Sequence, residues 1–113
     1  MSQITTHVLD VSLGRPAANV PVTLEVQDAG GAWREIARGA TDSDGRLHDL
    51  TASKTLYGGT YRISFNTLAY FASRNIEGLY PEVIIVFHLK NPHEPYHLPL
   101  LLSPYGYSTY RGS

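Results

Sequence analysis

Histidine and arginine side chains are the groups in this sequence best suited to acid–base or anion chemistry, because its 113 residues include no cysteine. His7 and His97 lie in stretches whose side chains alternate as those of β-strands do. An imidazole titrates at about pH 6.5 and can therefore act as a general base near neutral pH. A packed, hydrogen-bonded histidine is the ordinary alternative, and strand position leaves both roles open.

Arg46 follows the stretch TDSDG, whose composition predicts a turn. Its planar guanidinium suits an anionic group, although a solvated charge is the alternative. The Asp-x-Asp-Gly order resembles the start of a calcium loop, but position 51 is Thr where an EF-hand needs a bidentate Glu. The histidines also lack the spacing of a zinc site, including the less promising His48, His88 and His93. We expect no metal and no cofactor.

The elements that must position these groups are mostly strands. Alternation or β-branched composition predicts strands near residues 4–11, 20–27, 32–41, 60–66, 81–89, 96–103 and 105–111, the second and third joined as a hairpin. The continuous apolar run at 81–89 predicts a buried strand. Helical spacing predicts one short helix at 67–75, capped by Asn66 or Thr67. The sequence thus predicts one domain over residues 1–113, an all-β sandwich with one helix.

Composition excludes several classes of partner. The net charge is −1 and both signs are scattered along the chain, which argues against nucleic acid and against a charged membrane surface. No apolar run approaches the roughly 20 residues of a membrane span. The first ten residues do not resemble a secretory signal, so we expect a cytoplasmic protein.

Four motifs together resemble the transthyretin-related family. They are TTHVLD at 5–10, GRPA at 14–17, DGR at 44–46 and YHLPLLLSPYGYSTYRGS at 96–113, and the similarity extends from Ile4 to Ser113. The final Tyr-Arg-Gly-Ser is the most specific part. These motifs are those of the hydrolase branch of the family, so the resemblance implies hydrolysis of 5-hydroxyisourate to 2-oxo-4-hydroxy-4-carboxy-5-ureidoimidazoline in urate degradation.

The resemblance also implies an architecture and a set of site residues. The fold would be a transthyretin-like sandwich of two four-stranded sheets with one short α-helix. Four subunits would form a homotetramer, a dimer of dimers, with each site at the dimer–dimer interface. Matched by motif, the catalytic residues would be His7, Arg46, His97 and Ser113, and the substrate-binding residues would be Tyr110, Arg111 and Gly112.

The implied reaction needs a base for water and donors for a developing oxyanion. Either His97 or His7 would activate the water, and Arg46 would stabilise negative charge. Ser113 would supply its hydroxyl or the α-carboxylate that ends this sequence, and Gly112 would let the backbone approach the ligand. Two alternative functions stay open. The first is a transthyretin-like carrier of small molecules, which would need an open apolar channel rather than these polar groups. The second is a β-sandwich that serves only to bind other proteins.

Overall fold

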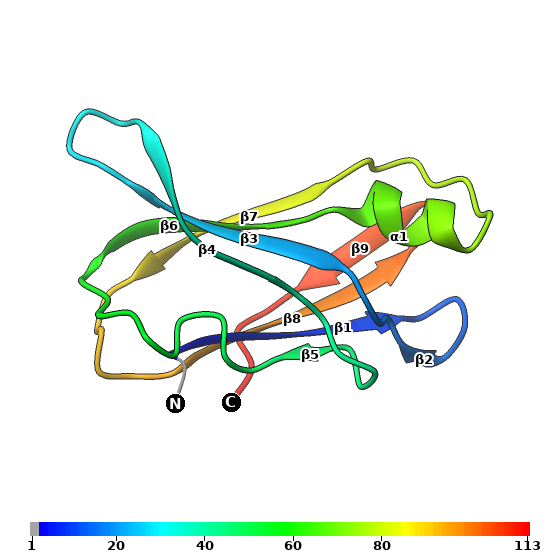
Figure 1. The fold of residues 1–113 in the computed structure, drawn as a ribbon, viewed down its shortest axis with the longest axis horizontal. Helices are drawn as coiled ribbons and strands as arrows, with labels where there is room; N and C mark the ends of the chain where they lie inside the picture. Colours follow the sequence, from blue (N-terminus) through cyan, green and yellow to red (C-terminus); the bar gives the residue numbers. More distant parts are fainter. Residues whose placement is uncertain (1–2) are drawn as a thin grey trace.

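Two β-sheets pack face to face in the computed structural model, which describes residues 3–113, and the helix lies at one end of the sandwich (Figure 1). One sheet has the order β2-β1-β8-β9, with β5 also pairing with β1, and the other has the order β4-β3-β6-β7. The elements are β1 (Ile4–Asp10), β2 (Arg15–Pro16), β3 (Pro21–Gln27), β4 (Trp33–Ala40), β5 (Arg46–Leu47), β6 (Gly59–Phe65), α1 (Thr67–Ser73), β7 (Val83–Leu89), β8 (Tyr96–Ser103) and β9 (Gly106–Thr109).

The predicted fold class, a two-sheet sandwich with one short helix, is confirmed. The sheet that contains β1 has five strands rather than four, because the two-residue strands β2 and β5 both pair with β1. The predicted hairpin of β3 and β4 is also present, with Val22 opposite Gly39. Strand β5 begins at Arg46, directly after the predicted turn.

Strands β1 and β8 pair in parallel, whereas the other strand pairs of residues 3–113 are antiparallel. Thr5 lies opposite His97, and His7 lies opposite Pro99. The pairing brings the first and the last motifs of the sequence into one sheet. It therefore places both predicted catalytic histidines on neighbouring strands.

The core between the sheets is made by alternate residues of each strand. Ile4 and Val8 of β1, Leu24 of β3, and Ile63 and Phe65 of β6 are fully buried. Burying each such side chain stabilises the fold by about 1.5–3 kcal/mol. Because the side chains of a strand alternate between its two faces, Thr5 and His7 project away from this core and are only half-buried.

Strand β7 differs from its prediction as a buried strand. It forms the edge of its sheet, and its side chains alternate between the core and the surface. Val83 and Leu89 are buried, but Ile84 is 40% exposed and Val86 is 58% exposed. The prediction was wrong for one face, because a β-branched run indicates a strand without saying what covers each side of it.

Helix α1 begins after Asn66, whose side-chain oxygen accepts a hydrogen bond from the backbone N–H of Ala69 at 3.0 Å. This is the predicted N-cap. The helix also carries Tyr70, whose hydroxyl donates to the buried carboxylate of Asp10 in β1 at 2.7 Å. The contact ties the helix to the sheet that holds the histidines. Within residues 3–113, no helix is long and apolar enough to cross a bilayer.

Candidate functional site

A shallow pocket of about 310 Å³ opens where β1, β5, the start of β8 and the C-terminal residues meet. Four of the predicted site residues line it: Arg46, His97, Gly112 and Ser113. The remaining lining residues are Thr5, Thr6, His48 and Pro95. Segments that are far apart in the sequence thus supply a base, a cation and hydroxyl groups to one surface.

A tight turn positions Arg46. One carboxylate oxygen of Asp42 accepts hydrogen bonds from the backbone N–H groups of Asp44, at 2.9 Å, and Arg46, at 3.0 Å. Gly45 has φ +75°, and a Cβ atom there would lie 2.4 Å from the carbonyl oxygen of Val8. Only glycine fits this position. The predicted turn is confirmed, and its backbone bonds hold the start of β5 against β1.

His7 supports that turn. Its Nε2 lies 2.8 Å from the backbone carbonyl oxygen of Asp44. A carbonyl oxygen only accepts, so this nitrogen carries the hydrogen of the bond. His7 also faces Arg46 in the antiparallel register of β1 and β5. The structure therefore places His7 beside Arg46, but not among the residues that line the pocket.

His97 is half-buried and lines the pocket. Its Nδ1 lies 2.8 Å from the hydroxyl oxygen of Thr5. Burial lowers the pKa of His97 below its ordinary value, and electrostatic repulsion from the guanidinium of Arg46, with smaller contributions from the nearby imidazoles of His7 and His48, lowers it further. Both effects disfavour the imidazolium form. The neutral form of the ring, which can accept a proton, is therefore favoured.

Gly112 holds the C-terminal segment against His97. Its backbone N–H donates to the carbonyl oxygen of His97 at 2.7 Å, and the two residues form an isolated antiparallel bridge. A Cβ atom on Gly112 would lie 2.7 Å from the Cδ2 atom of the His97 ring. The close approach that the structure shows is to the imidazole and brings Ser113 into the pocket, while the expected approach of Gly112 to a ligand stays a prediction.

Arg111 points elsewhere. Its guanidinium lies 4.1 Å from the centre of the Tyr96 ring, and it donates to a carboxylate oxygen of Glu94 at 3.2 Å and to the carbonyl oxygen of Pro95 at 3.1 Å. Tyr110 is 57% exposed. Neither Tyr110 nor Arg111 lines this pocket. Arg111 braces the segment that precedes His97 against the end of the chain.

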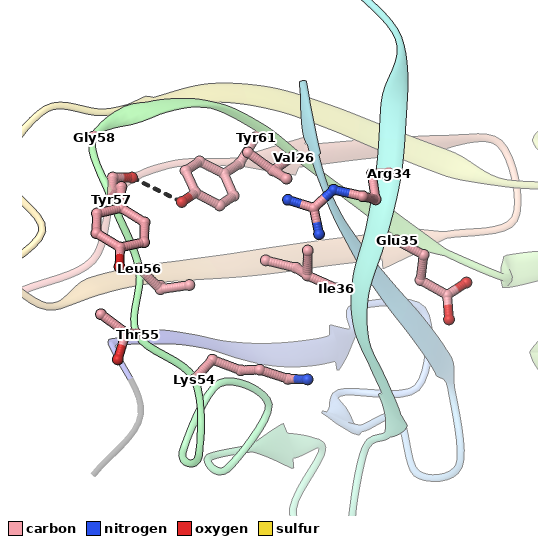
Figure 2. Close-up of a pocket in the computed structure, with 10 residues that line it drawn as sticks. All are labelled: Val26, Arg34, Glu35, Ile36, Lys54, Thr55, Leu56, Tyr57, Gly58 and Tyr61. Carbon is pink, nitrogen blue, oxygen red and sulfur yellow. Dashed lines mark hydrogen bonds between the residues drawn. The ribbon is translucent and has the colours of Figure 1, made fainter. Parts of the chain in front are cut away.

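A second pocket of about 340 Å³ lies between β4 and the segment that leads into β6 (Figure 2). Tyr61 stands at its wall, with its hydroxyl donating to the carbonyl oxygen of Tyr57 at 2.7 Å. The pocket contains none of the predicted site residues; its lining is Val26, Arg34, Glu35, Ile36, Lys54, Thr55, Leu56, Tyr57, Gly58 and Tyr61. Three of the four predicted catalytic residues, Arg46, His97 and Ser113, line the first pocket instead.

Comparison with known protein families identifies the family of this chain. The model of the HIUase/Transthyretin family matches residues 4–112. The chain belongs to this family. Among curated members, the 5-hydroxyisourate hydrolase of Salmonella typhimurium is 44% identical over 110 residues, which cover 97% of this chain and 80% of the relative. The 5-hydroxyisourate hydrolase of Mus musculus is 40% identical over 113 residues, covering 99% and 96%.

Solved structures of the HIUase/Transthyretin family share the fold. Klebsiella pneumoniae 5-hydroxyisourate hydrolase has a TM-score of 0.86 and 35% identity, covering 99% of this chain and 100% of its own. Sea bream transthyretin in complex with thyroxine has a TM-score of 0.92 and 32% identity, covering 98% and 95%. Because the hydrolase and the thyroxine-binding protein both match closely, the fold does not distinguish their functions.

Sequence reasoning missed four residues of the pocket: Thr5, Thr6, His48 and Pro95. For two of them the sequence held an indication of a place near the site. Thr5 is two residues before His7 and shares its face of β1, and His48 is two residues after Arg46. The sequence pattern could not reveal the parallel register of β1 and β8, which places Thr5 opposite His97. Within residues 3–113, no group of His, Asp and Glu side chains could hold a metal ion.

Proposed function

We propose that this protein hydrolyses 5-hydroxyisourate, a step of urate degradation. One observation carries the proposal: His97, whose lowered pKa favours the neutral ring, and the guanidinium-bearing Arg46 line the same pocket, in a chain 44% identical to a 5-hydroxyisourate hydrolase. The base and the cation are the two groups that hydrolysis of a cyclic amide requires.

In the proposed reaction, His97 takes a proton from water as the water oxygen attacks a ring carbonyl carbon of the substrate. Negative charge develops on the carbonyl oxygen, and Arg46 stabilises it through the guanidinium fork. The carbon–nitrogen bond then breaks, and the ring nitrogen receives the proton from the imidazolium. The sum is addition of one water molecule across the amide, with His97 returned to its neutral form.

The other predicted residues take supporting roles in this proposal. His7 holds the turn that presents Arg46, through its bond to the carbonyl of Asp44. Ser113 lines the pocket and offers polar atoms to the substrate or the water. Gly112 and Arg111 place Ser113 there, and Tyr110 is exposed and free to face substrate at an interface between subunits.

We also propose that the protein works as a homotetramer, a dimer of dimers with sites completed between subunits. The surface of the single chain supports an assembly of this kind. Edge strand β7 exposes Ile84 and Val86, and edge strand β9 exposes Tyr107 at 43%. Exposed apolar side chains on unpaired edges mark surfaces for association. Light scattering coupled to size-exclusion chromatography tests the stoichiometry.

One kinetic experiment tests the activity. Uricase generates 5-hydroxyisourate in a cuvette, the protein is added, and the ultraviolet band of the compound is followed against its spontaneous decay. We expect decay that accelerates in proportion to protein concentration. Tight binding without accelerated decay would instead establish a small-molecule carrier and overturn the proposal.

A further inference from the structure

The contact between Thr5 and His97 assigns a further role within the site, and this inference rests on the proposed hydrolase function. We infer that Thr5 is a positioning residue: its hydroxyl oxygen accepts a hydrogen bond from the Nδ1–H of His97 and keeps Nε2 unprotonated for the attacking water.

Thr5 and His97 form a close side-chain pair across two neighbouring strands. Thr5 and His97 are direct neighbours in the parallel register of β1 and β8, and Oγ1 and Nδ1 are 2.8 Å apart. Both side chains line the pocket and are half-buried. Since Nδ1 is engaged by Thr5, Nε2 is the ring nitrogen left for water. None of the residues that the structure describes makes a hydrogen bond to Nε2.

A histidine that acts as a base through Nε2 must carry its hydrogen on Nδ1. A neutral imidazole carries one hydrogen, so a basic Nε2 requires the hydrogen on Nδ1, and that hydrogen requires an acceptor. Hydroxyl oxygens accept as well as donate. When Nε2 takes a proton, Nδ1–H continues to donate to the same oxygen, so the contact survives the catalytic cycle unchanged. If Thr5 donated to Nδ1 instead, the bond would be lost at the step where His97 becomes charged.

The fold offers a matched control. Thr60 and His88 form the corresponding cross-strand pair in the other sheet, with Oγ1 and Nδ1 3.3 Å apart. His88 is exposed, and neither residue lines the pocket of Arg46 and His97. A threonine–histidine pair of the same kind thus lies outside the candidate site, where its loss should not affect catalysis.

The test combines ring nitrogen spectroscopy with kinetics. Long-range ¹⁵N–¹H spectra of the labelled protein, recorded above the pKa of His97, report which ring nitrogen carries the hydrogen. We expect Nδ1–H in the unmodified protein and in Thr5→Ser. In Thr5→Val we expect a mixture of His97 tautomers and a kcat at least about tenfold lower. Complete loss of a general base lowers the rate by roughly a hundredfold or more, and Thr5→Val impairs the base without removing it. Thr60→Val should change neither the His97 signals nor kcat.

Two results would overturn the inference: an Nε2–H signal from His97 in the unmodified protein, or a Thr5→Val variant that keeps both the Nδ1–H tautomer and full kcat. The unmodified spectrum needs no variant to fold. It also needs no substrate, so a failure of the tautomer assignment is separable from a failure of the proposed hydrolase activity.

Discussion

Gly112 lies against His97 so closely that a Cβ atom on the glycine would stand 2.7 Å from the Cδ2 atom of the ring. The same residue donates its backbone N–H to the carbonyl of His97. Position 112 therefore sets where the imidazole can lie, and a methyl group there would push the ring or the terminal segment out of place.

Gly112→Ala should accordingly lower kcat by about tenfold or more while leaving the fold intact, because a 1 Å misplacement of a catalytic group has large effects on rate. Turnover of freshly made 5-hydroxyisourate measures the rate, and circular dichroism measures the fold. Gly106→Ala is the control, since a Cβ there meets only the Ser103 hydroxyl oxygen at 3.7 Å. Full activity of Gly112→Ala would contradict the close fit.

His97→Gln and Arg46→Gln should each reduce kcat/KM by roughly two or more orders of magnitude, as expected for loss of a general base or of an oxyanion partner. Both variants should fold, because His97 is half-buried and Arg46 is exposed. Arg38→Gln is a suitable control, since its guanidinium pairs with Glu35 on the exposed face of β4. Near-normal turnover by both site variants would refute the proposed mechanism.

The titration of His97 should be shifted to acid pH. Burial comes first and the positive charge of Arg46 second among the causes that lower its pKa, so Arg46→Gln should raise it. NMR titration of the ring protons measures both values. Because the folded pKa lies below the unfolded one, the neutral ring favours the fold above about pH 6.5, and this contribution is lost as pH falls through the folded pKa. An unchanged pKa in Arg46→Gln would contradict this electrostatic account.

Local patterns predicted the parts of the molecule that depend on local chemistry. Alternation at 20–27 placed β3, Asn66 capped α1, and the composition of TDSDG predicted the turn before Arg46. Non-local relationships were out of reach. Neither the parallel pairing of β1 with β8 nor the two-residue strand β2 has a local signal, because both depend on segments that meet only in the folded chain.

The site divides in the same way. Motif resemblance selected Arg46, His97, Gly112 and Ser113, which share a pocket. The resemblance could not show that Arg111 lies outside the pocket, because sequence motifs do not indicate in which direction each side chain points. The stacking of Arg111 on Tyr96 is a tertiary contact.

Arg111→Gln should loosen the terminal segment without removing a group from the pocket. The variant loses the bonds to Glu94 and Pro95 and the stacking on Tyr96. We expect faster hydrogen exchange at the amide of Gly112, which bonds to His97, together with a lower kcat. Hydrogen-exchange NMR reports the first effect. Unchanged exchange at Gly112 with reduced activity would point instead to direct contact of Arg111 with substrate.

The Asp10–Tyr70 contact should govern stability at both extremes of pH. Burial opposes ionisation of Asp10, but hydrogen bonds from Ser12 and Tyr70 outweigh it and leave the pKa of Asp10 lowered. Burial and the bond to Asp10 raise the pKa of Tyr70 to about 12. The lowered pKa of Asp10 means that its contribution is lost as pH falls through that value. The raised pKa of Tyr70 means that its contribution is lost as pH rises from about 10 to about 12.

Tyr70→Phe should therefore lower the free energy of unfolding at pH 7 by about 1–3 kcal/mol, because it leaves the buried carboxylate short of a donor. The variant should also lose less unfolding free energy than the unmodified protein as pH rises from about 10 to about 12. Urea denaturation at a series of pH values measures both effects. Tyr105→Phe, at a side chain 71% exposed, is the control. Equal stability of the two variants would contradict a structural role for the buried pair.

The parallel pairing of β1 with β8 also has a consequence for biogenesis. Residues 4–10 can pair with β8 only when residues 96–102 are available, and the pocket further requires Gly112 and Ser113. A nascent chain on the ribosome holds His7 and Arg46 long before it can hold His97. Pairing between segments so far apart in the sequence is slow, because a long loop must close before the contacts are gained. Because the pocket needs residues from both ends of this sequence, we expect a chain without β8 or without Gly112 and Ser113 to be inactive, so that activity reports the presence of these segments in the folded protein.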